Sequence, residues 1–463
     1  MTRFLIFCLL LPGALAQAEK IAEPGSYTAQ VAGAVVAFDF KDIPAPVIAK
    51  VEQLIADSVA VAVGAHHIGL MNDLEEILEV NGGDSLILHS GKQGKLLEAV
   101  YLNAMAANML DFDDSHVLTG HPGASIIQPA LVIAQRYGNN REELIEAIVA
   151  GYEFNIRWSR AAFDFPAQLK GPWSSALLQA YGTTIATAKL LKLNQEQLQR
   201  AMYFMAAQMP LPVYQKLGLV PGQTVSALKN NYGQSAWGAV HAVLTARTGA
   251  QADGTVLDGD QGLWRMMGSP RFHPEELVKD LGSHWETLGV QIKPYAACRW
   301  MHAPIDGLLA LREQIPNAAA VKSIDVYSYD IAIDFLSKPN PDSLLELQFS
   351  LPHVFGLALA GESLIAMSEA QINNAAALSL AEKVTLHKDD RYQGLFVKKM
   401  LPAKVVITLT DGTVLEQEVL VPKGEESNPI ASDEHRLKIT TLIESSPHVN
   451  VREYANELLG ETL

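Results

Sequence analysis

Apolar residues recur with a helical period through the first half of the chain. Between residues 142 and 152 they return every three or four positions, while the acidic residues fall on other faces. This is the 3.6-residue period of an amphipathic helix. The Ala-rich runs 99–109 and 176–191 carry small residues on several sides, which lets neighbouring helices approach closely. We therefore predict a large all-helical domain over residues 17–269.

The pattern changes after the Gly-Ser-Pro sequence at residues 268–270. Residues 321–333 alternate apolar and polar side chains and are rich in β-branched and aromatic types, which predicts a strand. Residues 405–422 contain two alternating runs joined by Asp411 and Gly412. Such a pair is typical of a hairpin with a type I′ turn, so strands return in this half of the chain.

Helical patterns accompany these strands. Residues 357–367 and 372–380 lie between them, and residues 433–459 form a helical tail that begins with a Ser-Asp-Glu start signal. We therefore predict a second, α+β domain over residues 270–425. A C-terminal helical segment, residues 426–463, is expected to return to the first domain.

Composition narrows the class of protein. The 463 residues include 51 acidic and 35 basic side chains, so the net charge is −16, without the basic footprint of a nucleic-acid binder. Hydrophobic residues make up 49% and charged residues 19%, which excludes a disordered chain. The cysteines are Cys8 and Cys298. If Cys8 is removed with a leader, the mature chain has no internal disulfide.

The first sixteen residues have the layout of a cleaved secretory signal. Arg3 precedes an apolar stretch at residues 4–11, and Ala-Leu-Ala at residues 14–16 suits a signal peptidase. The alternative is an amphipathic or buried N-terminal helix. No other stretch is apolar enough to span a bilayer, so we expect a periplasmic or secreted protein without a membrane segment after cleavage.

The first candidate for chemistry is a polar cluster directly after an Ala-rich helix. It contains carboxylates at Asp111, Asp113 and Asp114 and imidazoles at His116 and His121. So many ionisable groups are costly to bury without partners, which favours a functional role. Asp113 and Asp114 have an equally good interpretation as helix caps or turn residues.

Two further clusters are basic. Lys229 and Tyr232 flank an amide-rich stretch that opens a helix, a place where a carboxylate or phosphate can bind. Lys293, Arg299 and His302 fall within ten residues and could pair with an anion. The alternatives are a solvated Lys229 and a structural His302, and Cys298 in the same stretch is more typical of a small buried residue than of a nucleophile.

Several chemistries lack their motifs. The chain has no dinucleotide-binding glycine fingerprint, no phosphate-binding Walker loop, no His-Glu-x-x-His and no Gly-x-Ser-x-Gly. A metal site from Asp111, Asp114, His116 and His121 is an open alternative, because O and N ligands suit Mn, Fe or Zn. The spacing matches no established ligand pattern, so we expect no metal and no cofactor.

The sequence resembles the MmgE/PrpD family, which includes 2-methylcitrate dehydratase, cis-aconitate decarboxylase and iminodisuccinate epimerase. The resemblance covers nearly the whole chain after the leader. Its most specific motif is Asn-Ala-Met-Ala-Ala-Asn-Met-Leu-Asp-Phe-Asp-Asp at residues 103–114. The other matching segments are residues 121–124, 147–153, 293–295 with Cys298 and His302, 349–352 and 411–412.

The resemblance implies a helical domain, a smaller α+β lid domain, an active site in the cleft between them, no cofactor or metal, and a homodimer. The chemistry it implies is proton transfer next to a carboxylate, with loss of water or carbon dioxide or inversion of a stereocentre. The residues it places in the site as catalytic are Asp111, His121, Lys229 and Lys293. It also places Ser115 and Cys298 in the site. We predict as substrate-binding, in addition to these two, His116, Trp173, Tyr232, Arg299, His302 and His353.

The chain also departs from the family pattern. Trp173 stands where many members have a histidine. His353 takes the place of the tyrosine in the usual Phe-Ser-x-Pro-Tyr. These changes make the pocket less polar and favour a substrate with fewer carboxylates. We therefore predict an exported, cofactor-independent lyase or isomerase in which His121, oriented by Asp111, moves the proton. The alternative is a non-catalytic periplasmic binding or scaffold protein on the same fold.

Overall fold

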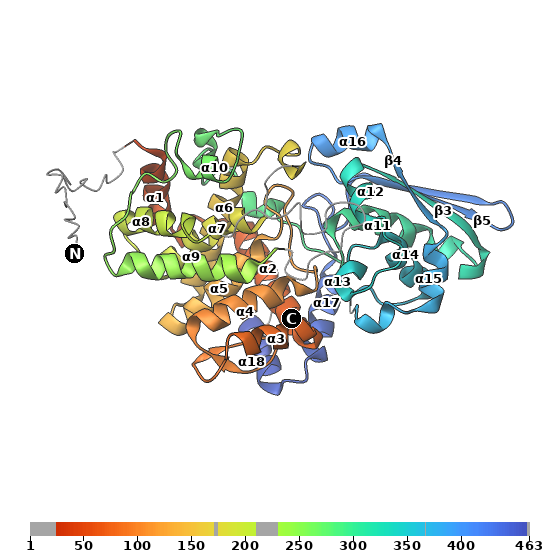
Figure 1. Cartoon of the computed structure of the whole chain (residues 1–463), viewed down its shortest axis with the longest axis horizontal. Helices are drawn as coiled ribbons and strands as arrows, with labels where there is room; N and C mark the ends of the chain where they lie inside the picture. Colours follow the sequence, from red (N-terminus) through yellow and green to blue (C-terminus); the bar gives the residue numbers. More distant parts are fainter. Residues whose placement is uncertain (1–24, 171–174, 210–229, 366, 461–463) are drawn as a thin grey trace, which may run out of the picture.

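The computed structural model describes residues 25–170, 175–209, 230–365 and 367–460. The predicted signal segment, Trp173 and Lys229 therefore lie outside the described residues. The chain is mainly helical, with a small mixed sheet in its C-terminal region. Figure 1 shows the helices of the first half gathered at one end of the molecule and the sheet at the other. This agrees with the mainly helical fold predicted from the sequence.

The first half forms a bundle of packed helices. Four of its helices, α4, α5, α7 and α9, contact one another in several pairs, and α6 packs along α7. A short antiparallel pair, β1 and β2, precedes α4. The bounds are α1 Tyr27–Ala37, α2 Ala45–Gly64, α3 Gly69–Ile77, β1 Ser85–Leu86, β2 Gln93–Gly94, α4 Leu96–Met109, α5 Pro122–Tyr137, α6 Arg141–Ala162, α7 Ser175–Leu190, α8 Gln195–Ala206, α9 Tyr232–Arg247 and α10 Leu263–Met266.

The local sequence explains the long helix α6. Asn140 accepts a hydrogen bond from the Glu143 N–H at 2.9 Å, and the Glu143 carboxylate accepts one from the Asn140 N–H at 2.9 Å, a complete capping box. Glycines then allow α6 to touch α7. A Cβ added at Gly182 would lie 2.8 Å from the Gly151 carbonyl oxygen, so these helices meet backbone to backbone.

The second half contains a four-stranded sheet with the order β4-β3-β5-β6. β3 and β4 are parallel, whereas β3–β5 and β5–β6 are antiparallel. Helix α11 packs against β5 and β6, and α14 packs against α15. The bounds are α11 His302–Leu311, β3 Val321–Ser328, α12 Asp330–Leu336, α13 Leu344–Leu347, α14 Leu351–Ala360, α15 Ala375–Ala381, β4 Val384–Lys388, α16 Asp390–Val397, β5 Ala403–Leu409 and β6 Val414–Val419.

Two predicted elements end earlier than expected. The strand predicted over residues 321–333 stops at Ser328, because helix α12 begins at Asp330. The helix predicted over residues 357–367 ends at Ala360, because Gly361 adopts a φ of 84° and terminates α14. The alternating pattern continues past Ser328, whereas Gly361, Glu362 and Ser363 interrupt the apolar run after Ala360 and mark the end of the helix in the sequence.

The predicted hairpin is present, but its turn differs from the prediction. Gly412 has a φ of 92°, and Asp411 is not among the residues with positive φ. The Gly412 N–H donates to the Leu409 carbonyl at 3.0 Å. The loop is therefore a turn closed by a left-handed glycine, whereas a type I′ turn needs two residues with positive φ.

The chain ends with two helices, α17 (Ser432–Ser445) and α18 (Val449–Leu459), both of which contact α2. In Figure 1 these blue helices lie beside the red and orange helices of the first half. Within the described residues, no single helix has the length and apolar character needed to cross a membrane. The bent pair Ala45–His67 and Gly69–Ile77 meets that test by length and composition together.

Candidate active site

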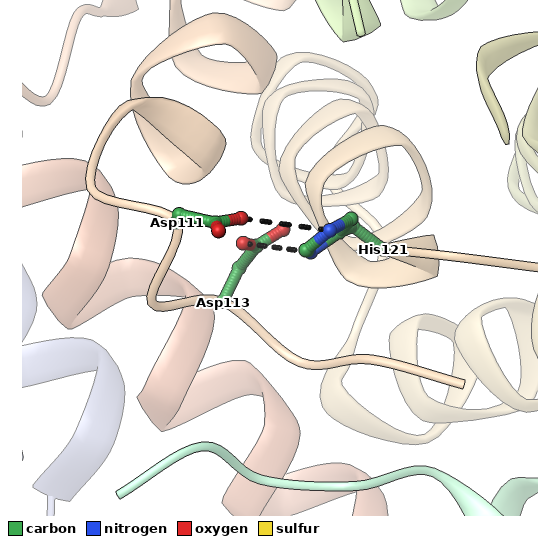
Figure 2. A group of neighbouring side chains, drawn as sticks. All are labelled: Asp111, Asp113 and His121. Carbon is green, nitrogen blue, oxygen red and sulfur yellow. Dashed lines mark hydrogen bonds and ion pairs between the residues drawn. The ribbon is translucent and has the colours of Figure 1, made fainter. Parts of the chain in front are cut away.

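The first site residue, Asp111, follows the end of helix α4. Its φ of 46° is left-handed, a conformation that aspartate tolerates better than most residues. The Asp111 N–H donates to the Asn108 carbonyl at 3.0 Å, which turns the chain sharply out of the helix. The turn brings the carboxylates of Asp111 and Asp113 to the same imidazole, that of His121 (Figure 2).

His121 lies at the N-terminal boundary of α5, between these two carboxylates (Figure 2). Its Nδ1 is 3.2 Å from Asp113 Oδ1, and its Nε2 is 3.5 Å from Asp111 Oδ1. The His121 side chain is 16% exposed, whereas those of Asp111 and Asp113 are 1% and 0% exposed. The imidazole is thus the accessible member of a buried cluster.

Amide side chains hold Asp113 in place. Asn108 donates to Asp113 Oδ1 at 2.9 Å, and Asn230 donates to Asn108 Oδ1 at 3.0 Å. Asp113 Oδ2 is buried and has no hydrogen-bond partner in the described part of the chain. The Nδ1 contact with Asp113 is the shorter of the two contacts of the ring, so the tautomer with its hydrogen on Nδ1 can donate to Asp113 while Nε2 carries the lone pair.

The second half of the chain contributes Lys293. Ser115 and Gln291 exchange two backbone hydrogen bonds, Ser115 N–H to Gln291 O at 3.0 Å and Gln291 N–H to Ser115 O at 2.8 Å. This pairing brings the fully buried Lys293 ammonium to the Asp111 carbonyl at 2.6 Å and to Asp111 Oδ1 at 3.2 Å. The predicted residues Asp111, His121 and Lys293 therefore lie together.

Asp114 fastens the loop of the cluster to helices α5 and α6. Its Oδ1 accepts the Gly123 N–H at 2.8 Å, in the first turn of α5, so the cap interpretation of Asp114 is confirmed. Its Oδ2 accepts the Tyr152 hydroxyl at 2.6 Å. Burial and the neighbouring Asp113 raise the pKa of Asp114 to about 7. The Asp114 carboxyl group therefore changes its protonation state near neutral pH.

Two other predicted residues from this half occupy different positions. Tyr232 lies near His121, with 6.1 Å between ring centroids, and its hydroxyl is 2.6 Å from the Ser175 hydroxyl. His116 accepts the Leu118 N–H at 3.4 Å and does not take part in the His121 cluster. Burial, with a smaller contribution from Arg160, lowers the pKa of His116 to about 3, so its ring is neutral.

Arg299 and His302 are held by protein atoms. Arg299 donates to Gln291 Oε1 at 3.0 Å, to the Lys423 carbonyl at 2.8 Å and to Glu425 Oε1 at 2.9 Å. Its Nη1 also contacts His302 Nδ1 at 3.1 Å. These contacts use four of the five N–H groups of a guanidinium. Burial, then the positive charge of Arg299, lowers the pKa of His302 far below its usual value.

The remaining predicted residues are spread out. Ser115 donates to Gln291 Oε1 at 2.8 Å, and the buried Cys298 gives its N–H to the Gln348 carbonyl at 2.9 Å. His353 Nε2 contacts the Gln371 carbonyl at 2.9 Å, within the second half of the chain. Trp173 and Lys229 lie outside the described residues.

Among the described residues, one set of side chains has the geometry to ligate a cation. Single ligand atoms of Asp111, Asp113 and His121 all lie within 4.8 Å of one another. The Lys293 ammonium already neutralises Asp111 from 3.2 Å, and it would repel a divalent ion bound there. The charge arrangement favours proton chemistry at this cluster over metal binding.

Asp113 has a larger role in the structure than the sequence predicts. The sequence predicts that Asp111 orients the imidazole, yet the shorter contact to His121 is that of Asp113. The signal was present in the spacing, since Asp111 and Asp113 both precede the histidine in one short polar run. Asn108 and Gln291 were missed, because an isolated amide in an apolar helix or loop has no distinctive pattern.

Comparison with known proteins identifies the family of the chain. The MmgE/PrpD N-terminal domain matches residues 29–275, and the MmgE/PrpD C-terminal domain matches residues 295–458. The cis-aconitate decarboxylase-like protein oryM of Aspergillus oryzae is 24% identical over 91% of each chain. The cis-aconitate decarboxylases of Aspergillus terreus and Mus musculus are each 23% identical, over 90% of each chain for the former and over 73% of this chain and 70% of the relative for the latter. The resemblance inferred from the sequence is thereby confirmed: the chain belongs to the MmgE/PrpD family and is an enzyme of its lyase-like type.

Proposed function

We propose that the enzyme transfers a proton at the carbon next to a carboxylate of a small substrate, in a decarboxylation or dehydration. The observation that carries this proposal is the His121 imidazole, placed between two buried carboxylates beside a buried ammonium. Several relatives are cis-aconitate decarboxylases, which favours decarboxylation.

The geometry suggests how the residues divide the work. Asp113 accepts the Nδ1 hydrogen, which leaves His121 Nε2 to take or deliver the proton. Once Nε2 is protonated, the imidazolium lies between Asp113 and Asp111, and both carboxylates stabilise it. A histidine suits this task because its ordinary pKa lies near neutral pH.

For a decarboxylation the electrons balance simply. The bond between the carboxylate and its carbon breaks, carbon dioxide leaves, and the electron pair stays on the carbon. The imidazolium of His121 then supplies the proton that completes the product. Lys293, whose buried ammonium lies beside Asp111, would add positive charge to the cluster and help to stabilise the negative charge that develops.

The test is proton NMR of the purified enzyme in heavy water, with cis-aconitate first and then a panel of small carboxylates. Loss of carbon dioxide, or deuterium incorporation next to a carboxylate, would support the proposal. A His121→Asn variant should abolish both. A folded wild type that binds a panel member without any exchange would favour the binding-protein alternative, and loss of activity with strong chelators would favour a metal site.

We also propose export, on the basis of the basic, apolar and small-residue segments at the N-terminus. N-terminal sequencing of the protein recovered from a periplasmic fraction should then begin after residue 16. A chain that starts at residue 1 or 2 in the cytosol would contradict it. The homodimer implied by the family resemblance stays a prediction, which light scattering in solution would check.

A further inference from the structure

Lys438, on the C-terminal helix α17, is buried and belongs to none of the sequence motifs named above. Its side chain is 1% exposed. The same face of α17 carries apolar residues, among them Ile439 and Leu442, so a lysine here has to find polar partners within the protein. A lone buried ammonium would otherwise cost several kcal/mol.

The partners of Lys438 come from three separate parts of the chain. Its Nζ is 2.6 Å from Asp57 Oδ1, 2.7 Å from the Phe112 carbonyl oxygen and 3.0 Å from the Lys293 carbonyl oxygen. An ammonium has three N–H donors, so these three acceptors satisfy it fully. The ammonium also lies 3.9 Å from the centroid of the Phe112 ring.

Two of these acceptors belong to the backbone of the candidate site. Phe112 lies between Asp111 and Asp113, the two carboxylates beside His121. Lys293 directs its own ammonium to Asp111. One side chain thus fixes the backbone from which both sides of the cluster project.

We propose that Lys438 is a positioning residue, which holds the Asp111–Asp113 loop and the Lys293 segment in register for proton transfer. This inference rests on the proposed function of His121. Lys438 acts through the backbone of these residues, and its charge is balanced by Asp57. Misplacing catalytic groups by about 1 Å can lower a rate about 100-fold, so rigid support here matters.

The chain offers a matched control on the same helix. His435 also contacts Asp57, with Nε2 3.0 Å from Oδ1, and it lies one turn before Lys438 on the same face. Its contact with Asp57 does not involve the carbonyls of Phe112 or Lys293. Loss of either side chain should weaken the docking of α17, whereas only loss of Lys438 should disturb the site.

The experiment compares Lys438→Met with His435→Asn. We expect Lys438→Met to lower kcat by about 10- to 100-fold with KM within about threefold of the wild type. His435→Asn should lower the melting temperature and leave kcat unchanged. If Lys438→Met does not fold, the double variant Asp57→Asn with Lys438→Met takes its place in the comparison, because it removes both buried charges together.

A second measurement does not depend on turnover. In histidine-labelled protein, the ring signals of His121, assigned by their loss in His121→Asn, should move in the Lys438 variant and stay in place in His435→Asn. Equal kcat and unmoved His121 signals in a folded Lys438 variant would overturn the positioning role. If the wild type is inactive on every substrate but the Lys438 substitution still moves these signals, the proposed function is overturned and the positioning role of Lys438 stands.

Discussion

The two segments that meet at the site are both buried and rich in charge, yet they use their charges differently. On the loop from Asp111 to His121, the imidazole is 16% exposed and Asp113 Oδ2 has no hydrogen-bond partner among the described residues. On the segment from Gln291 to His302, the polar groups bind one another and the segment around Glu425.

The first segment therefore carries the group that can react with a substrate, and the second segment holds the site in place. A group that can exchange protons with a substrate needs an accessible atom, and His121 has one. Arg299 and His302, which the sequence presents as substrate-binding candidates, instead form their hydrogen bonds with protein atoms. Lys293 is the exception, since it belongs to the supporting segment and directs its charge into the reactive loop.

The comparison is tested most strongly with the two histidines. His121→Asn should lower kcat about 10²- to 10⁴-fold, the usual contribution of general acid–base catalysis. His302→Asn should leave kcat within a few-fold and instead lower the free energy of unfolding by about 1–3 kcal/mol, the cost of unsatisfied buried groups. Steady-state kinetics and chemical denaturation measure both. Equal losses of kcat in the two variants would remove the distinction.

The link between the segments is tested with Lys293→Met. Lys293→Met removes the buried ammonium from beside the Asp111 carboxylate, so the free energy of unfolding should fall by about 3–5 kcal/mol. Asp111→Asn combined with Lys293→Met should recover much of the stability without activity, because both charges of the buried ion pair are then removed together. Urea denaturation of the single and double variants measures this, and a double variant less stable than the single one would contradict the pairing.

Asp114→Asn tests the reactive side through pH. Its folded-state pKa, about 7, lies above the ordinary value of 3.8, so the folded protein holds this proton more tightly than the unfolded chain. The contribution is therefore fully present below the ordinary value and is lost as the pH rises through 7. From pH 5 to pH 8, the wild type should lose about 3 kcal/mol of stability relative to Asp114→Asn. Parallel stability curves would refute this.

The smallest effect is expected on the supporting side. Glu425 accepts from Gln291 at 2.8 Å and pairs with Arg299 at 2.9 Å, near the protein surface. Glu425→Gln should cost about 1 kcal/mol of unfolding free energy and leave kcat unchanged. Thermal denaturation with a parallel activity assay measures it. A loss of activity above tenfold would show that the supporting segment takes part in catalysis more directly.

The sequence predicted the fold class well, because helical periodicity and alternating strands are local signals. It located boundaries less well: the alternating pattern runs on past the end of β3, and the predicted helix was continued past Gly361, the residue that ends α14. At the site, Asp111, His121 and Lys293 stood out as ionisable groups in apolar surroundings, and the structure brings them together.

What the sequence did not indicate depends on contacts between distant segments. Asp113 looked equally suited to a cap, and only the position of the His121 ring distinguishes it. Lys438 had one weak signal, a lysine on the apolar face of a predicted helix. Two of its three acceptors are backbone carbonyls, which carry no residue identity, so no motif could reveal them.

That choice of acceptors affects how the protein matures. Lys438 is 326 positions from Phe112 and 145 from Lys293, so the chain has to emerge from the ribosome as far as Lys438 before these hydrogen bonds can form. Until then the loop with His121 lacks its anchor. A nascent or C-terminally truncated chain should therefore be inactive even when its helical half has folded, which confines activity to completed molecules.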